Sequence, residues 1–294
     1  MSSFFTYVFN GISLGSVYAI IALGYTMVYG IAKMLNFAHG DVIMIGGYVL
    51  FSMIYGSGTN VFAALIVAMV VCTVLGVVIE KVAYKPLREA SSLAVLITAI
   101  GVSILLQNIA QLIFTSQPKM FRNPIKLGSV KMFGANIEGS TILMIVLGII
   151  IVVALSIFIR KTKTGRAMLA VSEDKDAAKL MGINVNTTIT ITFAIGSALA
   201  ALASLLMFNA YPSLIPTSGS MPGIKAFVAA VFGGIGSISG AMVGGIVLGI
   251  IEVLSGAYIP NGTKLANAIV FVVLIVVLIF KPTGLFGKKI KEKV

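Results

Sequence analysis

The chain has 294 residues, of which 59% are hydrophobic and 10% are charged, and its mean hydropathy is +1.08. Soluble domains carry about 25% charged residues, so most of this surface must face lipid rather than water. A single cysteine, Cys72, excludes an intrachain disulfide, and 31 glycines without a strict period exclude a collagen-like fibre. We therefore predict an all-α fold, a polytopic transmembrane helical bundle, with residues 1–294 forming one domain.

The hydrophobic stretches predict about eight membrane spans. A hydrocarbon core about 30 Å thick needs about 20 apolar residues per helix. Residues 1–10 have no basic region and no small-residue cleavage site, so we expect the first stretch to be retained rather than removed as a signal peptide. In chain order the stretches are 7–31, 38–55, 61–83, 91–114, 140–159, 187–209, 223–257 and 265–280.

The Gly-rich stretch 223–257 is too long for one span and too short for two spans and a turn. Interrupted backbone at membrane depth is tolerated where protein or a water-filled cavity satisfies its polar groups. We predict a short or re-entrant helix followed by a full one, and leave open whether 223–237 crosses the bilayer. Small residues four apart also allow helix backbones to approach closely, which predicts a packing surface or a seam with another subunit. These residues are Gly236, Gly240, Gly244, Gly245 and Gly249.

The basic residues predict the orientation. An outside N-terminus puts the linker 84–90, the loop 160–186 and the tail 281–294 on one side, and most of the 21 Lys and Arg residues lie there. By the positive-inside rule that side is cytoplasmic, and the loop 115–139 is outside. The net charge of +12 is thus explained by topology and does not indicate nucleic-acid binding.

The residues needed for enzyme chemistry are missing from the sequence. One histidine and one cysteine cannot supply a metal site at ordinary spacing, and no phosphate-binding loop is present. We therefore expect no catalytic residue, no metal and no cofactor in this chain.

Residues 164–183 predict a short helix outside the lipid. Ser172 is the expected N-cap, Glu173 and Asp174 suit the first turn, and Gly182 suits the position after the last turn. The helix either lies on its own protein or docks into a groove of a partner, and its apolar stripe suits both. That stripe consists of Ala177, Leu180 and Met181.

Polar residues within the spans mark a pathway or a pair. We expect Lys225 and Glu252 to pair if the broken segment folds back, with substrate contact as the alternative. Asn36, His39 and Asp41 lie at the inner mouth, where Asn36 or Asp41 caps the second span or the three form a gate. His39 would make transport sensitive to pH. The other polar groups available to a pathway are Gln107, Asn108, Gln111 and Asn209.

Several blocks of sequence resemble one family of transport proteins. They include residues 10–19 and 24–31, the motif Asn-Phe-Ala-His-Gly at 36–40, and residues 165–183, 223–241 and 281–287. Together they resemble the H-type permease subunit of high-affinity branched-chain amino acid ABC transporters.

The resemblance implies a permease that translocates Leu, Ile or Val across a bacterial plasma membrane. It implies a second related permease subunit, two cytoplasmic ATPase subunits that bind ATP, and an extracytoplasmic amino-acid-binding protein. The alternatives are a related ABC permease for a sugar or other amino acids, and an ion-coupled carrier, for which Asp41 and Glu252 would be the only embedded acids. The resemblance also implies that the loop 160–186 seats in an ATPase groove through Arg166, Glu173, Asp174, Asp176, Ala177, Ala178, Leu180 and Gly182.

Overall fold

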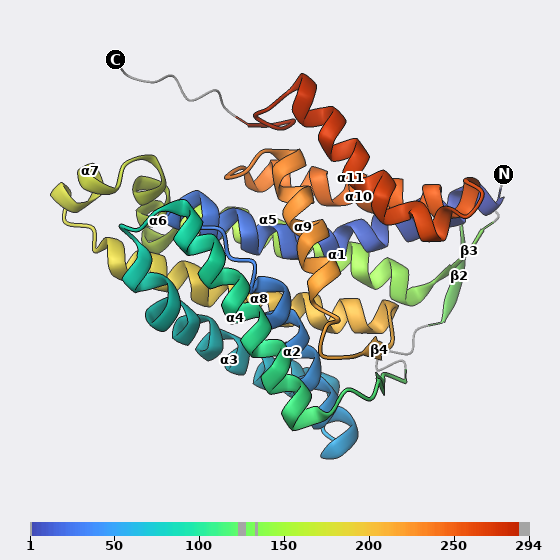
Figure 1. Ribbon diagram of the computed structural model, residues 1–294. Coiled ribbons are helices and arrows are strands. Elements are labelled where there is room, and N and C mark those ends of the chain that lie inside the picture. The colour runs from blue at the N-terminus through green and yellow to red at the C-terminus, as the bar shows by residue number, and fades with distance from the viewer. Residues whose placement is uncertain (1, 123–127, 133–134, 288–294) are drawn as a thin grey trace. The chain divides into compact units, whose positions relative to one another are not determined.

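The computed structural model describes residues 2–122, 128–132 and 135–287 (Figure 1). Lys126 and most of the basic tail, 288–294, lie outside the described residues. The helices are α1 (Ser2–Ala32), α2 (His39–Phe51), α3 (Val61–Ile79), α4 (Ser92–Phe114), α5 (Gly139–Lys161), α6 (Lys163–Glu173), α7 (Lys175–Leu180), α8 (Val185–Ala210), α9 (Ser220–Gly233), α10 (Ile238–Tyr258) and α11 (Gly262–Phe280).

Within the described residues, seven helices are long and apolar enough to cross a membrane, which confirms the polytopic helical bundle. They are α1, α3 with its extension to Leu87, α4, α5, α8, α10 and α11. The predicted stretch 38–55 is the exception: it forms α2, with 13 residues, followed by the π-helical turn Ser52–Gly56, and is not among these seven. A second π-helical turn, Glu80–Tyr84, follows α3 and leads into the 3₁₀ turn Lys85–Leu87.

The Gly-rich stretch breaks where its glycines predicted. The helix α9 ends at Gly233 and α10 begins at Ile238, with Gly234 and Gly236 at positive φ in the turn between them. At 14 residues α9 is about 21 Å long, which is shorter than the hydrocarbon core of about 30 Å. The prediction of a short helix followed by a full one is therefore confirmed.

Polar side chains at the helix starts define where several helices begin. The side-chain oxygens of Asn60, Ser91, Asn184 and Ser237 accept the N–H groups of Phe62, Ala94, Thr187 and Gly240, respectively. Such caps satisfy N–H groups that have no partner within the first turn.

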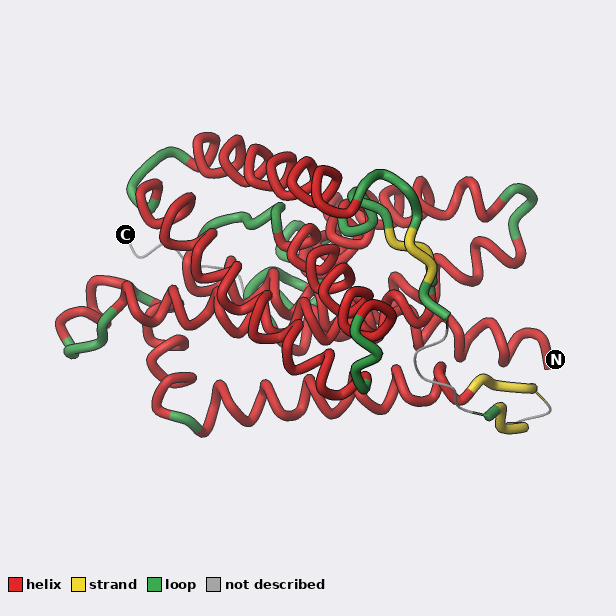
Figure 2. The backbone as a smooth tube through the Cα atoms, turned by 90° about the horizontal axis from the view of Figure 1, so that it is seen from below, coloured by secondary structure: helices red, strands yellow, loops and turns green. Residues whose placement is uncertain are grey.

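The loop 115–139 contains short strands that its polar composition did not predict (Figure 2). The strands β2 (Ser129–Met132) and β3 (Ala135–Glu138) form an antiparallel hairpin in which Ser129 faces Glu138. The strand β1 (Lys119–Met120) pairs with β4 (Ser213–Leu214), so Lys119 faces Leu214.

The chain divides into two compact units. One comprises 1–26, 127–152 and 225–294, and the other comprises 27–126 and 153–224. In the first, α10 packs on the N-terminal part of α1 and on α11; in the second, α8 packs on α2 and α3.

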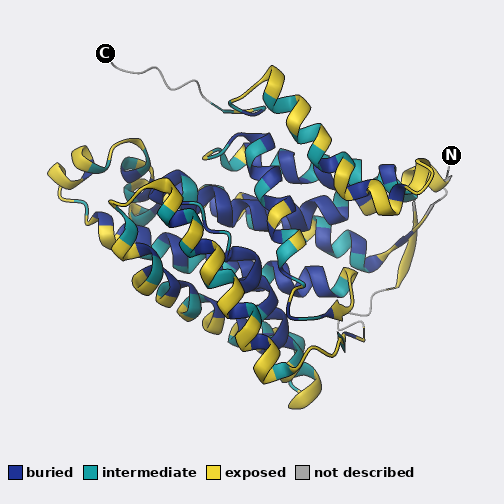
Figure 3. Cartoon of the chain, viewed as in Figure 1, coloured by how far each residue is buried: buried dark blue, intermediate teal, exposed yellow. Residues whose placement is uncertain are grey.

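Burial differs sharply between the helices (Figure 3). In an apolar stretch of 18 residues within α1, 94% of the residues are buried, whereas in the corresponding stretch of α11 only 11% are buried. One face of α3 and of the π-helical turn after it carries an exposed row of apolar side chains at every fourth position, as expected for contact with lipid. The row is Phe62, Ile66, Val70, Val74, Val78 and Val82.

Candidate functional site

The segment 160–186 contains two helices, α6 and α7, rather than the single helix expected. Thr162 caps α6 through the N–H of Gly165 at 2.9 Å. Asp174 caps α7, because its Oδ1 accepts the N–H groups of Asp176 and Ala177 at 2.8 and 3.0 Å. The prediction of Ser172 as the N-cap was wrong, since its hydroxyl lies within α6 and donates to the Leu169 carbonyl.

The end of α7 has the predicted glycine termination. Gly182 has φ +78°, its N–H donates to the Lys179 carbonyl, and the Ile183 N–H donates to the Ala178 carbonyl, both at 3.0 Å. These two bonds form a Schellman motif, which ends a helix in a defined conformation. The following backbone is therefore held rather than frayed.

The surface of α7 exposes its apolar tip. Leu180 and Met181 are 90% and 82% exposed, whereas Ala178 is 3% exposed. Ala178 therefore belongs to the internal packing of the segment, and Leu180 and Met181 project from it. The other predicted docking side chains, Arg166, Glu173, Asp174, Asp176 and Ala177, are also exposed.

One hydrogen bond ties α7 to the end of α1. The Lys175 Nζ donates to the Ala32 carbonyl at 3.0 Å, which satisfies an orphan carbonyl of the last α1 turn. Burial lowers the pKa of Lys175, and the neighbouring charges of Arg88, Lys33 and Lys179 lower it further. This bond is a direct side-chain contact between α7 and the end of α1.

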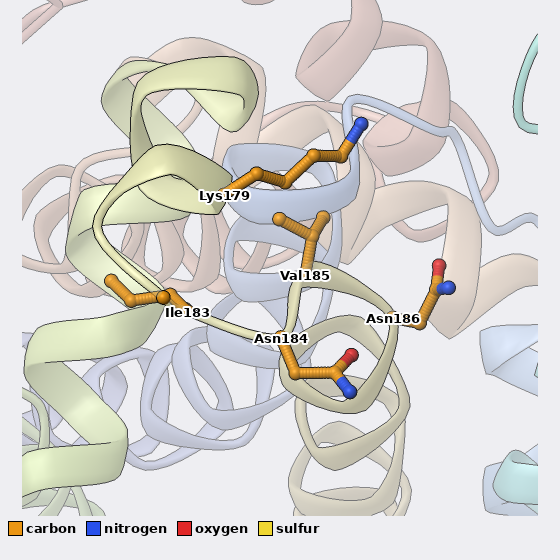
Figure 4. A pocket seen from close by; sticks show the side chains of 6 residues that line it. Lys179, Ile183, Asn184, Val185 and Asn186 are labelled. Atoms are coloured by element: carbon orange, nitrogen blue, oxygen red, sulfur yellow. The ribbon is translucent and has the colours of Figure 1, made fainter.

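A pocket of about 360 Å³ opens beside the loop between α7 and α8. Figure 4 shows the side chains of Lys179, Asn184 and Asn186 around this loop. Asn184 is engaged as the cap of α8 through the Thr187 N–H at 3.1 Å. Backbone and side chains of 182–185 complete the lining.

A buried ion pair lies next to this pocket, and the sequence analysis missed it. Glu80, at 0% exposure, pairs with Arg88 and accepts the Thr190 hydroxyl at 2.8 Å. Arg88 also donates to Asn186 at the start of α8. An acid near the end of the apolar stretch 61–83 was the available signal, since such a group requires a partner.

The side chain of Asn36 joins a different element from the one predicted. Its Oδ1 accepts the Tyr84 hydroxyl at 2.9 Å, at the end of the π-helical turn after α3. The N-cap of α2 is Ala38, which makes no side-chain cap. The prediction that Asn36 or Asp41 caps this helix was therefore wrong. His39 and Asp41, in its first turn, are each 1% exposed.

Asp41 forms a polar cluster with α4 and the start of α9. Its Oδ1 accepts the Gln107 Nε2 at 2.9 Å, and the same amide nitrogen lies 3.1 Å from both Ser103 Oγ and Ser220 Oγ. The neighbouring Asn108, which was named as a pathway residue, is exposed and donates to the Ile104 carbonyl of its own helix. Gln107 is thus the inward-facing amide of α4.

Lys225 and Glu252 form the predicted pair. The Lys225 Nζ lies 2.6 Å from Glu252 Oε1, and the Tyr18 hydroxyl donates to Glu252 Oε2 at 3.0 Å. The ammonium also lies 5.7 Å from the centre of the Tyr18 ring. The pair joins α1, α9 and α10 within one unit.

The glycines of α10 make close backbone contacts. A Cβ at Gly240 or Gly244 would collide with the backbone of α9, and one at Gly245 or Gly249 would collide with α1. The predicted packing surface is confirmed for these four residues. Gly236 was wrongly included, because it lies in the turn between α9 and α10 with φ +91°.

Comparison with known proteins places the chain among transport permeases. The sequence profile of the family "Branched-chain amino acid transport system / permease component" matches residues 7–278. The high-affinity branched-chain amino acid transport system permease proteins LivH of Salmonella typhimurium and Escherichia coli K12 are each 45% identical, over 99% of this chain and 98% of theirs. The corresponding protein BraD of Pseudomonas aeruginosa is 42% identical, over 97% of this chain and 96% of its own.

Proposed function

The chain belongs to the family of branched-chain amino acid transport permeases, and we propose that its segment 160–186 couples ATP hydrolysis in a partner to movement of its helices. The chain is the permease component of a branched-chain amino acid ABC transport system, in a bacterial inner membrane, and is not itself a catalytic enzyme. The family decides against the sugar-permease and ion-coupled-carrier alternatives. Membership implies ATPase and binding-protein partners.

The proposed assembly pairs this chain with a second related permease and with two cytoplasmic ATPase subunits. ATP binds to those subunits, and this chain needs no cofactor of its own. The proposed orientation places the N-terminus outside and the segment 160–186 in the cytoplasm, as the distribution of basic residues supports. Leucine, isoleucine or valine arrives from the binding protein.

The observation that carries the coupling proposal is the exposed Leu180–Met181 tip of α7. Two large apolar side chains at 90% and 82% exposure outside the membrane spans are suited to a partner's groove. The Asp174 cap and the Gly182 termination hold this tip in one conformation. Preorganisation of this kind lowers the entropy cost of docking.

Three contacts within one unit carry movement of the tip to the helices. Lys175 joins α7 to the end of α1. Asn186 and Thr190 join the start of α8 to the end of α3, because Asn186 bonds Arg88 and Thr190 bonds Glu80. A displacement of α7 by the ATPase therefore acts on the ends of α1, α3 and α8 without any catalytic residue in this chain.

The test uses Leu180→Asp and Met181→Asp in the purified transport complex. Each variant should lose ATPase subunits on purification and lose at least about tenfold in ATP-dependent leucine uptake, because a charge replaces an apolar contact. Lys179→Gln is the matched control, since its ion pair with Asp176 is exposed and contributes little. Full uptake and a complete complex in both aspartate variants would refute the coupling role.

A further inference from the structure

Three carboxylates with side chains at most 14% exposed lie within the helices and turns of the described chain, and one of them differs from the other two. Glu80 has Arg88 and Glu252 has Lys225 as an ion-pair partner. Asp41 is 1% exposed, yet its side-chain partner Gln107 is neutral. Among the residues that the structure describes, no Lys, Arg or His nitrogen lies within 4.0 Å of the Asp41 carboxylate.

The Asp41 cluster lies within the length of α4, a candidate membrane span, rather than at its end. Gln107 is 15 residues after the start of α4 and 7 before its end, which corresponds to about 22 Å and about 10 Å along the helix axis. The carboxylate bonded to it has a similar depth. A charge inside a span is costly and usually balances a second charge or marks the path of one.

The helices around Asp41 are arranged as a polar site. Gln107 comes from α4, Ser220 from the first residue of α9, and Asp41 from the first turn of α2. Seven residues beyond Asp41 and Gln107, Tyr48 stacks on Phe114 with ring centres 4.2 Å apart. The helices α2 and α4 therefore run parallel over this face, with the polar group at one end and the aromatic pair at the other.

A close backbone contact shuts this site. Gly40 precedes Asp41, and a Cβ there would collide with the backbone of Gly219, which precedes Ser220. The starts of α2 and α9 thus touch through two glycines, which directly precede Asp41 and Ser220 in the chain. Separation of these two helix starts would expose Asp41, Gln107 and Ser220 together.

We propose that Asp41 binds the α-ammonium group of the transported amino acid when the starts of α2 and α9 separate, an inference that rests on the proposed transport of leucine, isoleucine or valine. An ammonium supplies the missing positive charge, and its N–H groups donate to the carboxylate in charge-assisted hydrogen bonds. The Gln107 and Ser220 oxygens are available to accept the remaining N–H groups. The site binds the α-ammonium group that all three amino acids share, and the aliphatic side chain contacts apolar surfaces.

The experiment measures leucine uptake by proteoliposomes that contain the whole transport complex, its binding protein and internal ATP. Asp41→Asn keeps an oxygen acceptor for Gln107 and removes the charge, so we expect at least a tenfold loss of the initial uptake rate. Asp41→Glu keeps the charge and should retain more uptake than Asp41→Asn. Asn108→Ala is the matched control, because Asn108 is exposed and bonded only to its own helix.

A second variant separates charge recognition from a structural role. Gln107→Lys places a fixed ammonium beside Asp41 and should stop uptake while the melting temperature of the complex stays equal or rises. Normal uptake in Gln107→Lys, or in Asp41→Asn, overturns the proposal, as does an Asp41→Asn loss matched by a lowered melting temperature. The proposal is also overturned if leucine uptake requires an inward proton gradient in the wild type but not in Asp41→Asn. That result would mean that Asp41 binds a proton during transport.

The outcomes for the two proposals are distinguishable. If the wild-type complex takes up no branched-chain amino acid, the proposed function fails. If the wild type takes up leucine and Asp41→Asn does so at the same rate, only the ammonium site fails.

Discussion

Lys225 and Glu252 are separated by 27 positions in the chain, and their side-chain charges lie 2.6 Å apart. The break at Gly234 and Gly236 permits this, because it turns α10 back along α9. Tyr18 completes the arrangement by donating to the second carboxylate oxygen. The two charges neutralise each other at a place where an isolated charge would be costly.

Removing one member of this pair should strongly destabilise the protein. Lys225→Met leaves Glu252 without its cation, and we expect the free energy of unfolding to fall by about 3–5 kcal/mol. The double variant Lys225→Met with Glu252→Gln should lose less than the sum of the single losses. Unfolding curves in detergent measure both, and strictly additive losses would contradict a coupled pair.

The Glu80–Arg88 pair should behave differently from the pair on the surface of α7. Arg88→Met leaves a fully buried carboxylate and frees Asn186, so a loss of about 3–5 kcal/mol is expected. Lys179→Met removes a pair whose members are 63% and 90% exposed, so its effect should stay below about 1 kcal/mol. Similar losses in both variants would show that burial does not set their contributions.

The glycines at the contact of α1 and α10 should tolerate no larger residue. A Cβ at Gly15 would lie 2.6 Å from the Ile246 Cα, so Gly15→Ala should cost about 1–3 kcal/mol by forcing the helices apart. Gly101→Ala in α4 is the control, since nothing lies within 4 Å of its added methyl. That control should gain about 0.5–1 kcal/mol in helix propensity, and the two melting temperatures should move in opposite directions.

Lys175 should give the stability of the complex a dependence on alkaline pH. Burial lowers the pKa of Lys175 in the folded state below its ordinary value of 10.5. At pH values between the folded-state pKa and the unfolded-state pKa, the unfolded chain therefore binds more protons than the folded chain. The free energy of unfolding therefore rises with pH over that interval. Melting temperatures measured at alkaline pH up to 10.5 should show this rise, and Lys175→Met should reduce it. An unchanged slope in Lys175→Met would assign the rise to another group.

Most of the membrane spans and the break between α9 and α10 were predictable because their signals are local. Apolar length marks the spans, and the positive-φ glycines at 234 and 236 mark the break between α9 and α10. The Lys225–Glu252 pair followed from that break together with the high cost of unpaired charge in a membrane.

The inward face of α4 was not predictable, because lipid and protein interior are both apolar. A membrane helix therefore lacks the polar stripe that shows which face a soluble helix buries. Gln107 and Asn108 are adjacent and chemically alike, and only packing against α2 and α9 makes Gln107 the internal amide. The Asp41 cluster was missed for the same reason.

The caps of α6 and α7 show a second limit. Ser172 and Asp174 are both favourable N-caps, and they lie two residues apart. The choice depends on α6, where Gly165, Met168 and Val171 are buried and extend the helix through Ser172. Tertiary packing thus moved the cap to Asp174.

The contact between Tyr18 and Glu252 spans 234 positions, nearly the whole chain. A ribosome adds about 5–20 residues per second, so the first span waits about 12–47 seconds for the helix that carries its partner. During that time Gly11 and Gly15 lack the α10 backbone that they contact in the folded chain. A nascent chain that stops before residue 252 cannot close this contact, so synthesis of α10 is a condition for packing the N-terminal part of α1.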